Sequence, residues 1–440
     1  MATLPMQFSF STRPQQQARQ RDEDDLFRIL VLADLGGSPA ARGARPLLQR
    51  KPLAIDLDNF DQVMARMVPQ LTLTLDGVPL TIAFQDMDDF HPDQLFARLP
   101  PFVALRQLRA SLADPAQFHS AAAALGSKTA GHGAAGFVAA PEASELERLL
   151  GRKAAAPPPA ATDGGNSAVP NIDTWLRSIV SPYVVQDISG EQAQWLAAVD
   201  AALSATMRSL LHHPAFQALE ANWRSIEHLV RELDPGQRIA LLLQDVSRDE
   251  LAQDLADHAA DLSQSALHHH LCGPQTEPPD GQAWSLLVSD QSFTASLAEL
   301  QWLASLAAMA ARAGAPLLAA ADPALLGCAG VDRLTAPKTW QPLAPDVAAF
   351  WHDLRHSPLA RWLGLALPRI LTRLPYGLKS DPINAFAFEE QVPREHESYL
   401  WGSPAFSLAL LAGQSFLDDG WQMDLAAQLA LDDLPSHIYR

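Results

Sequence analysis

Cysteine is almost absent from this chain of 440 residues, which contains only Cys272 and Cys328. Two thiols cannot form a disulfide scaffold, and their positions match no zinc-binding spacing. The N-terminal segment lacks the apolar core of a signal peptide, and no apolar run reaches the roughly 18 residues that a membrane span needs. We therefore expect a cytoplasmic protein in a reducing compartment, without direct membrane insertion.

Basic residues are also scarce: 32 Lys and Arg stand against 50 Asp and Glu, giving a formal net charge of -18. Nucleic acids and anionic membranes attract basic surfaces, so this balance argues against general affinity for either. The chain is 48% hydrophobic and 19% charged, which is typical of a globular protein with a buried core. We expect a soluble protein, or a subunit whose basic patches meet acidic ones.

Recognisable catalytic motifs are missing as well. There is no P-loop, H-E-x-x-H or C-x-x-C. The G-x-G-x-x-G at 131–136 lies in an Ala/Gly/Pro-rich stretch without the preceding strand that a dinucleotide site requires. Ser415 lies within a helical pattern and lacks the second glycine of a nucleophile elbow. The adjacent histidines at 268–270 do not converge on one ion. The sequence therefore predicts no enzyme, no cofactor and no metal.

Composition divides the chain into four segments. Residues 1–26 are polar and predicted to be disordered. Residues 27–118 predict a small α+β unit, which begins with an apolar strand at Phe27 and contains a hairpin around Asp76-Gly77. Residues 119–171 are rich in Ala, Gly and Pro and predict a linker.

Residues 172–440 alternate between strand and helix patterns. The near-continuous apolar runs RIALLLQDV, WSLLVSD and APLLAAAD predict strands covered on both faces. Ser247 and Glu250 form a capping box that predicts the start of a helix, and Gly314 predicts the end of another. This order predicts a larger α/β core with a mainly parallel sheet, within a mixed α+β protein.

Charged residues are concentrated around the Pro-Tyr-Gly loop at 375–377. Arg369 and Arg373 precede it, and Lys379 and Asp381 follow it. This density of charge suits a buried or interfacial ion-pair site as well as a phosphate site. We favour an ion-pair site at an interface.

Several long motifs resemble a known family. LLHHPAFQALEANWRSIEHLV (210–230), LPRILTRLPYGLKSDPINAFAFEE (367–390) and YLWGSPAFSLAL (399–410) resemble the large sheath subunit of type VI secretion systems, the TssC/VipB type. The resemblance covers roughly 172–440. FRILVLADLGG, RKPLAIDLDNFDQVMARM and FQDMDDFHPDQLFARLPPFVALRQLR resemble the small sheath subunit, the TssB/VipA type, over about 27–112. The chain therefore resembles a fusion of two subunits that are usually separate.

The resemblance implies a contractile sheath that assembles by inter-subunit strand exchange around an inner tube and ejects it. Its implied partners are other sheath subunits, the inner tube protein, a baseplate and a recycling AAA+ ATPase, and it implies no catalysis. We expect the interface and structural positions to be Phe216, Trp223, Arg369, Arg373, Tyr376, Lys379, Asp381 and Trp401.

The sequence departs from the family pattern in two ways. The large subunit continues past the segment that resembles LPSHIYR, whereas this sequence ends at Arg440. The segment that the family offers to its ATPase has no clear match in the linker. An alternative is therefore a sheath-like adaptor, cap or regulator that does not polymerise.

Overall fold

The computed structural model describes residues 8–10, 23, 25–37, 45–75, 77–126, 172–181, 192–273, 283–391, 395–425, 430–431 and 434–435. The glycine motif at 131–136 and most of the predicted linker lie outside these ranges. The chain divides into two compact units. The first comprises Met1–Leu73, Leu80–Leu95 and Arg208–Arg440, and the second comprises Thr74–Pro79 and Phe96–Met207.

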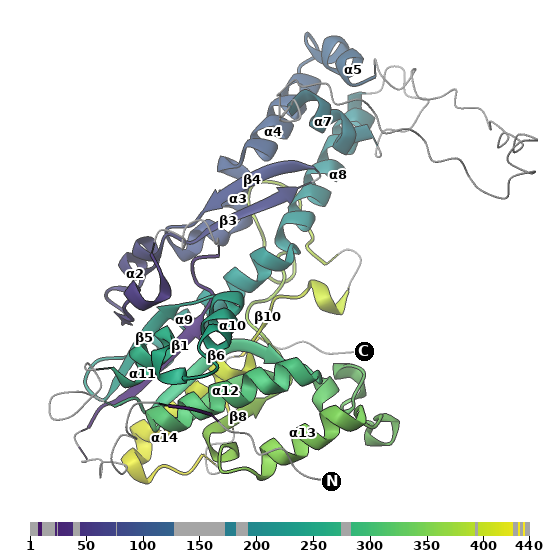
Figure 1. Ribbon diagram of the computed structural model, residues 1–440. Coiled ribbons are helices and arrows are strands. Elements are labelled where there is room, and N and C mark those ends of the chain that lie inside the picture. The colour runs from purple at the N-terminus through teal and green to yellow at the C-terminus, as the bar shows by residue number, and fades with distance from the viewer. Residues whose placement is uncertain are drawn as a thin grey trace, which may run out of the picture. The chain divides into compact units, whose positions relative to one another are not determined.

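A six-stranded sheet lies at the centre of the first unit (Figure 1). Its strand order is β2-β5-β1-β6-β7-β8, and every pairing is parallel except that of β2 with β5. The predicted α/β class with a mainly parallel sheet is thereby confirmed. The strands are β1 (Phe27–Ala33), β2 (Leu53–Ile55), β5 (Ile239–Asp245), β6 (Leu286–Phe293), β7 (Leu317–Ala321) and β8 (Leu363–Ala366).

Helices cover both faces of this sheet, as the alternation of side chains along β1 shows. Leu30 and Leu32 point toward the face that α12 covers, whereas Phe27 points the other way and stacks on Phe416 of α14, with ring centroids 4.8 Å apart. The first face carries α10 (Arg248–Asp257), α11 (Ala266–Cys272), α12 (Leu297–Ala313) and α13 (Pro345–His356). The second carries α14 (Pro404–Asp419), against which α9 (Pro214–Leu233) packs.

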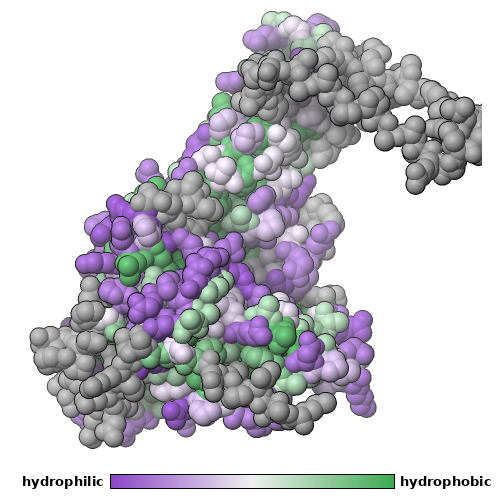
Figure 2. Space-filling model, viewed as in Figure 1, coloured by the Kyte–Doolittle hydropathy of each residue, from purple (hydrophilic) through white to green (hydrophobic). Residues whose placement is uncertain are grey.

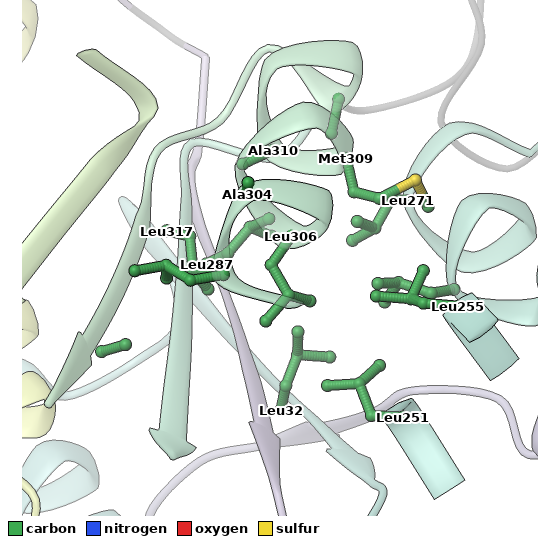
Figure 3. Close-up of a cluster of buried hydrophobic side chains, with 14 of the residues drawn as sticks. Leu32, Leu251, Leu255, Leu271, Leu287, Ala304, Leu306, Met309, Ala310 and Leu317 are labelled. Carbon is green, nitrogen blue, oxygen red and sulfur yellow. The ribbon is translucent and has the colours of Figure 1, made fainter. Parts of the chain in front are cut away.

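An apolar core lies between the sheet and the first helical layer (Figure 3). Leu32 of β1 lies near Leu251 of α10 and Leu306 of α12, and all three are at most 2% exposed. The capping box of Ser247 and Glu250 is confirmed at the start of α10. Gly314 ends α12 with a φ of 68°, a left-handed conformation that glycine adopts without strain.

Two small sheets complete the strands of the described residues. The predicted hairpin forms β3 (Gln70–Leu75) and β4 (Val78–Ala83), in which buried and exposed residues alternate. β9 (Ile370–Leu371) pairs antiparallel with β10 (Trp401–Gly402). Helix α2 (Phe60–Met67) buries Phe60, Val63 and Met64.

The second unit is mainly helical. Gln192 at the start of α8 donates hydrogen bonds from Nε2 to the carbonyl oxygens of Leu112 and Ala113 at the end of α4, each at 2.8 Å. Arg109 of α4 also pairs with Asp200 of α8, with Nε and Oδ1 2.5 Å apart. The helices are α4 (Pro100–Ala113), α5 (Phe118–Gly126), α7 (Ile172–Val180) and α8 (Gln192–Leu211). The boundary between the two units falls within α8 and within α3 (Pro92–Arg98).

Short 3-10 helices connect many of these elements. They span Leu47–Gln49, Met87–Phe90, Leu262–Gln264, Pro323–Leu326, Val331–Arg333, Pro337–Thr339, Ala360–Trp362, His396–Ser398 and Gly420–Gln422.

Three structural observations bear on the sequence-based segmentation, which stays a prediction. First, β1 and β2 share one sheet with β5–β8, because the apolar strand β1 is buried on both faces and pairs at both edges. Second, residues 8–10 are ordered against the core: Leu262 donates its backbone N–H to the carbonyl of Ser9 at 2.9 Å, and Phe8 and Phe10 pack on the core. Third, α5 occupies the predicted start of the linker and buries Phe118.

The surface shows no continuous apolar band on the face drawn in Figure 2, where hydrophilic residues surround scattered hydrophobic ones. None of the helices in the described ranges combines the length and the apolar character that crossing a bilayer demands.

Candidate functional site

The strongest polar feature of the first unit is a buried ion-pair network at the base of the Pro-Tyr-Gly loop. Arg373 lies 2.8 Å from Glu220 (Nε to Oε1) and 2.8 Å from Glu390 (Nη1 to Oε2). The three side chains are 7%, 0% and 1% exposed. Glu220 comes from α9 and Glu390 from the far end of the loop, so a single guanidinium ties both ends of the loop to a helix of the core.

Arg224 and Tyr376 extend the network. Arg224 lies one helical turn after Glu220 and donates to its Oε1 at 2.8 Å and to the hydroxyl of Tyr376 at 3.3 Å. The Arg373 guanidinium also lies over the Tyr376 ring, 4.2 Å from its centroid. Two cations therefore balance two carboxylates, which removes most of the cost of burying charge.

The protonation of these groups follows from their mutual attraction. Burial disfavours the charged form of Glu390, but Arg373 outweighs it and lowers the pKa of Glu390 to about 2. Burial likewise opposes the charge on Arg373, yet Glu220 and Glu390 raise the pKa of Arg373 well above its usual value. Burial also raises the pKa of Tyr376 to about 12, so its hydroxyl remains neutral. Arg373 and Glu390 are thus both ionised at neutral pH.

The tip of the loop projects outward from this base. Leu378 is 77% exposed and Leu374 42% exposed, while Lys379 and Asp381 are exposed and lack side-chain ion pairs in the described part of the chain. Backbone contacts hold the tip: Gly377 donates its N–H to the carbonyl of Asp381 at 2.8 Å. Glu389 also accepts the N–H of Leu378 at 3.1 Å. A constrained loop therefore presents an apolar and charged tip to the surroundings.

Arg369 and Trp401 lie apart from the buried network. Arg369 pairs with Glu397 at 2.9 Å, and the two side chains are 42% and 72% exposed. Its guanidinium also lies 5.8 Å from the centre of the Trp401 ring, and Trp401 donates from Nε1 to the carbonyl of His396 at 2.7 Å. The four charged residues that sequence places in one cluster are therefore distributed over three environments.

Phe216 and Trp223 are fully buried in the core of the chain itself. Phe216 contacts Phe84 and Phe90 edge-on, and Trp223 donates from Nε1 to the carbonyl of Leu35 at 3.1 Å. These contacts give both residues a role in packing α9. An interface role for the exposed Arg369, Lys379 and Asp381 and for the partly buried Trp401 stays a prediction.

A hollow adjoins the network at Arg224. Arg224 and His228 line it from the helix, Thr372 from the segment after β9, and Ser403 from the start of α14. Its lining is mixed, because apolar side chains such as Ile370, Phe406 and Leu434 lie beside these polar ones.

Sequence reasoning missed the carboxylates on which the site depends. Glu220 and Arg224 have the i, i+4 spacing of a helical ion pair, which was a readable signal. Glu390 had no comparable signal, because its partner Arg373 lies on the other side of a loop.

A second carboxylate, which is partly buried, lies at the carboxyl ends of the parallel strands. Asp290 in β6 accepts hydrogen bonds at Oδ2 from Asn222 Nδ2 at 2.9 Å and from the N–H of Asp34 at 3.1 Å. Burial nevertheless raises the pKa of Asp290 to about 6. The carboxyl edge of an open α/β sheet is a common ligand site, but here Asn222 of α9 and the loop after β1 occupy it. In the described ranges no three His, Cys, Asp or Glu side chains meet in a metal-binding group.

Comparison with known proteins places this fold among the sheath proteins of type VI secretion systems. The VipB family model, the EvpB-type tail sheath N-terminal domain, matches residues 193–440, and the chain belongs to this family. The VipA model of the same secretion system matches residues 11–125. The chain thus joins a small-subunit and a large-subunit sheath segment in one polypeptide.

Two curated proteins from Pseudomonas aeruginosa are similar to the two segments. The type VI secretion system sheath protein TssC1 is 32% identical over 230 residues, which cover 51% of this chain and 46% of TssC1. The sheath protein TssB1 is 35% identical over 95 residues, covering 20% of this chain and 55% of TssB1. The chain spans about half the length of the curated relatives it matches.

Proposed function

We propose that this chain is a structural subunit of a type VI secretion contractile sheath, and not an enzyme. The observation that carries the proposal is the composition of the six-stranded sheet. β1 and β2 come from the VipA-like segment, β5 to β8 come from the VipB-like segment, and β1 pairs with β5 and β6. The fusion therefore supplies both sheath segments as one hydrogen-bonded building block, since a tether raises the effective concentration of its two modules.

Assembly proceeds by strand exchange between such blocks. In the described residues β3 and β4 pair only with each other, as do β9 and β10, so each small sheet has edges that a strand from another subunit can extend. The loop at 373–390 supplies side-chain contacts beside β9, because its base is locked by Arg373 and its tip exposes Leu378. The partners are other sheath subunits, arranged in the cytoplasm around an inner tube.

Contraction is a change between two packings of the same subunits. It requires rigid blocks with adjustable contacts. A buried ionised network that fixes the loop to α9 suits a rigid block, whereas the exposed pair of Arg369 and Glu397 suits a contact that can be exchanged. By family analogy the baseplate and a recycling AAA+ ATPase are further partners.

Negative-stain electron microscopy tests the proposal. The full chain is imaged alone and after mixing with separately expressed TssB-type and TssC-type subunits. Rings or tubes that contain the chain are expected in at least one condition. A monodisperse small particle in both conditions, with no incorporation into tubes formed by the ordinary subunits, contradicts the sheath role and favours the adaptor alternative.

A further inference from the structure

Two histidines on α13 lie on one face of the helix, one turn apart. His352 and His356 have the i, i+4 spacing that places both imidazoles side by side. Their rings stack with centroids 4.1 Å apart and an interplanar angle of 26°. The His352 side chain is 69% exposed, so the pair is open to solvent. The sheath role uses neither residue.

An oxygen atom lies beside Nδ1 of each ring, at hydrogen-bond distance for His356 and farther away for His352. The Nδ1 of His356 lies 2.7 Å from the carbonyl oxygen of His352. The Nδ1 of His352 lies 3.5 Å from Oδ1 of Asp353. An oxygen beside Nδ1 favours the tautomer with the proton on that nitrogen, which leaves the lone pair of Nε2 available. A carbonyl or carboxylate behind each imidazole is also the arrangement that supports histidine ligands in metal sites.

We propose that the Nε2 atoms of His352 and His356 chelate a divalent first-row transition metal ion. Two histidines at i, i+4 on one helical face are the spacing that metal-binding helices use. Imidazole nitrogen selects Cu²⁺, Ni²⁺ and Zn²⁺, whereas Mg²⁺ and Ca²⁺ require oxygen ligands. The order of affinity at such a site is Cu²⁺ above Ni²⁺ and Zn²⁺.

The site has two ligands from this chain. No third His, Cys, Asp or Glu joins the pair among the described residues, so water or a group from another molecule fills the remaining positions. This distinguishes it from a closed structural zinc site with four protein ligands. Binding spans successive turns of α13 and therefore stabilises the folded helix by mass action.

The histidine run on α11 provides a contrast within the same chain. His269 and His270 are adjacent in sequence, and their rings lie 6.0 Å apart at 73°. The Nε2 of His270 lies 2.8 Å from the carbonyl oxygen of Leu47, which occupies the nitrogen that would bind a metal. The pair on α13 has neither obstacle.

Isothermal titration of the untagged full chain with Cu²⁺, and then with Zn²⁺, tests the site. Wild-type protein is compared with His352→Ala, His356→Ala and the double variant, and His269→Ala serves as the matched control. Because chelation makes the second contact intramolecular, either single α13 substitution weakens the tightest site by about 100-fold, while the control leaves it unchanged. Protons compete for the same nitrogens, so acidification weakens binding.

Circular dichroism verifies that each variant is folded, since both side chains are exposed. The proposal is overturned if the double variant binds Cu²⁺ as tightly as wild type. It is also overturned if each single substitution lowers the number of bound ions without changing the affinity, because that result describes independent single-histidine contacts. Both outcomes are independent of whether the chain enters a sheath.

Discussion

Arg373 Nη1 and Glu390 Oε2 lie 2.8 Å apart, and both side chains are almost completely buried. This contact joins the two ends of a loop, because the two residues are 17 positions apart in sequence. A buried ion pair adds little net stability relative to apolar residues, but removing one partner leaves an uncompensated charge. The pair therefore matters chiefly for holding one particular loop conformation.

Glu390→Gln tests this relationship. We expect the free energy of unfolding to fall by about 3 kcal/mol, because Arg373 retains only Glu220 as a buried counter-charge. Glu397→Gln is the matched control: it breaks the exposed pair with Arg369 and should cost less than about 1 kcal/mol. Urea denaturation of both variants gives the comparison, and equal losses would show that the burial of the network has no energetic role.

The pKa of Asp290, raised to about 6 from 3.8, predicts a pH-dependent stability. A carboxyl whose pKa is raised by folding contributes stability below about pH 4, and that contribution is lost as pH rises through 6. Two pKa units correspond to roughly 3 kcal/mol. Relative to Asp290→Asn, wild-type protein should thus lose about 3 kcal/mol between pH 4 and pH 8.

Unfolding measured at several pH values on both proteins checks this expectation. The quantity of interest is the difference between them, since it cancels the titration of all other groups. The contribution of Glu390 to stability has the opposite pH dependence. Its pKa is lowered to about 2, so this contribution is present above about pH 4.5 and is lost in stronger acid. A difference that stays constant from pH 4 to pH 8 would contradict the assignment for Asp290.

Individual strands of the sheet could be predicted from sequence, because a strand leaves a pattern in neighbouring residues. The run from Phe27 to Leu32 is apolar at nearly every position, which predicts a strand, and the structure confirms it as part of β1. Its neighbours were not predictable, because β1 pairs with Ile239–Asp245 more than 200 positions away. Strand order depends on such long-range pairing, which leaves no local pattern.

The same distinction applies to the candidate site. The charge density around residues 375–377 is visible in the sequence, and in the structure Arg373 lies in a buried ion-pair network. Periodicity could not reveal that Arg369 faces solvent beside Glu397 while Arg373 points inward, since the residues between them form only a two-residue strand. The inward direction is set by Glu220 on α9, a partner distant in sequence.

Trp223→Phe tests the packing of α9. The change removes the Nε1 donor and leaves the fully buried carbonyl of Leu35 without it, which should cost about 1–3 kcal/mol. Trp302→Phe is the control, because its buried Nε1 has no hydrogen-bond partner in the described part of the chain. Both changes remove similar volume, so thermal unfolding isolates the hydrogen bond. The same loss in both would assign the effect of Trp223 to volume alone.

Leu378→Ser separates folding from assembly. The side chain is 77% exposed, so its replacement should change the free energy of unfolding by no more than about 0.5 kcal/mol. If the tip of the loop is buried by a neighbouring sheath subunit, the lost apolar contact is worth about 1.5–3 kcal/mol at each interface. Incorporation into sheath assemblies, measured by sedimentation with TssB-type and TssC-type subunits, should therefore fall at least about tenfold.

Leu57→Ser is the control: it alters another leucine that is 50% exposed and should leave incorporation unchanged. Equal incorporation of both variants and wild type would exclude the loop tip from the interface while leaving the ion-pair network intact.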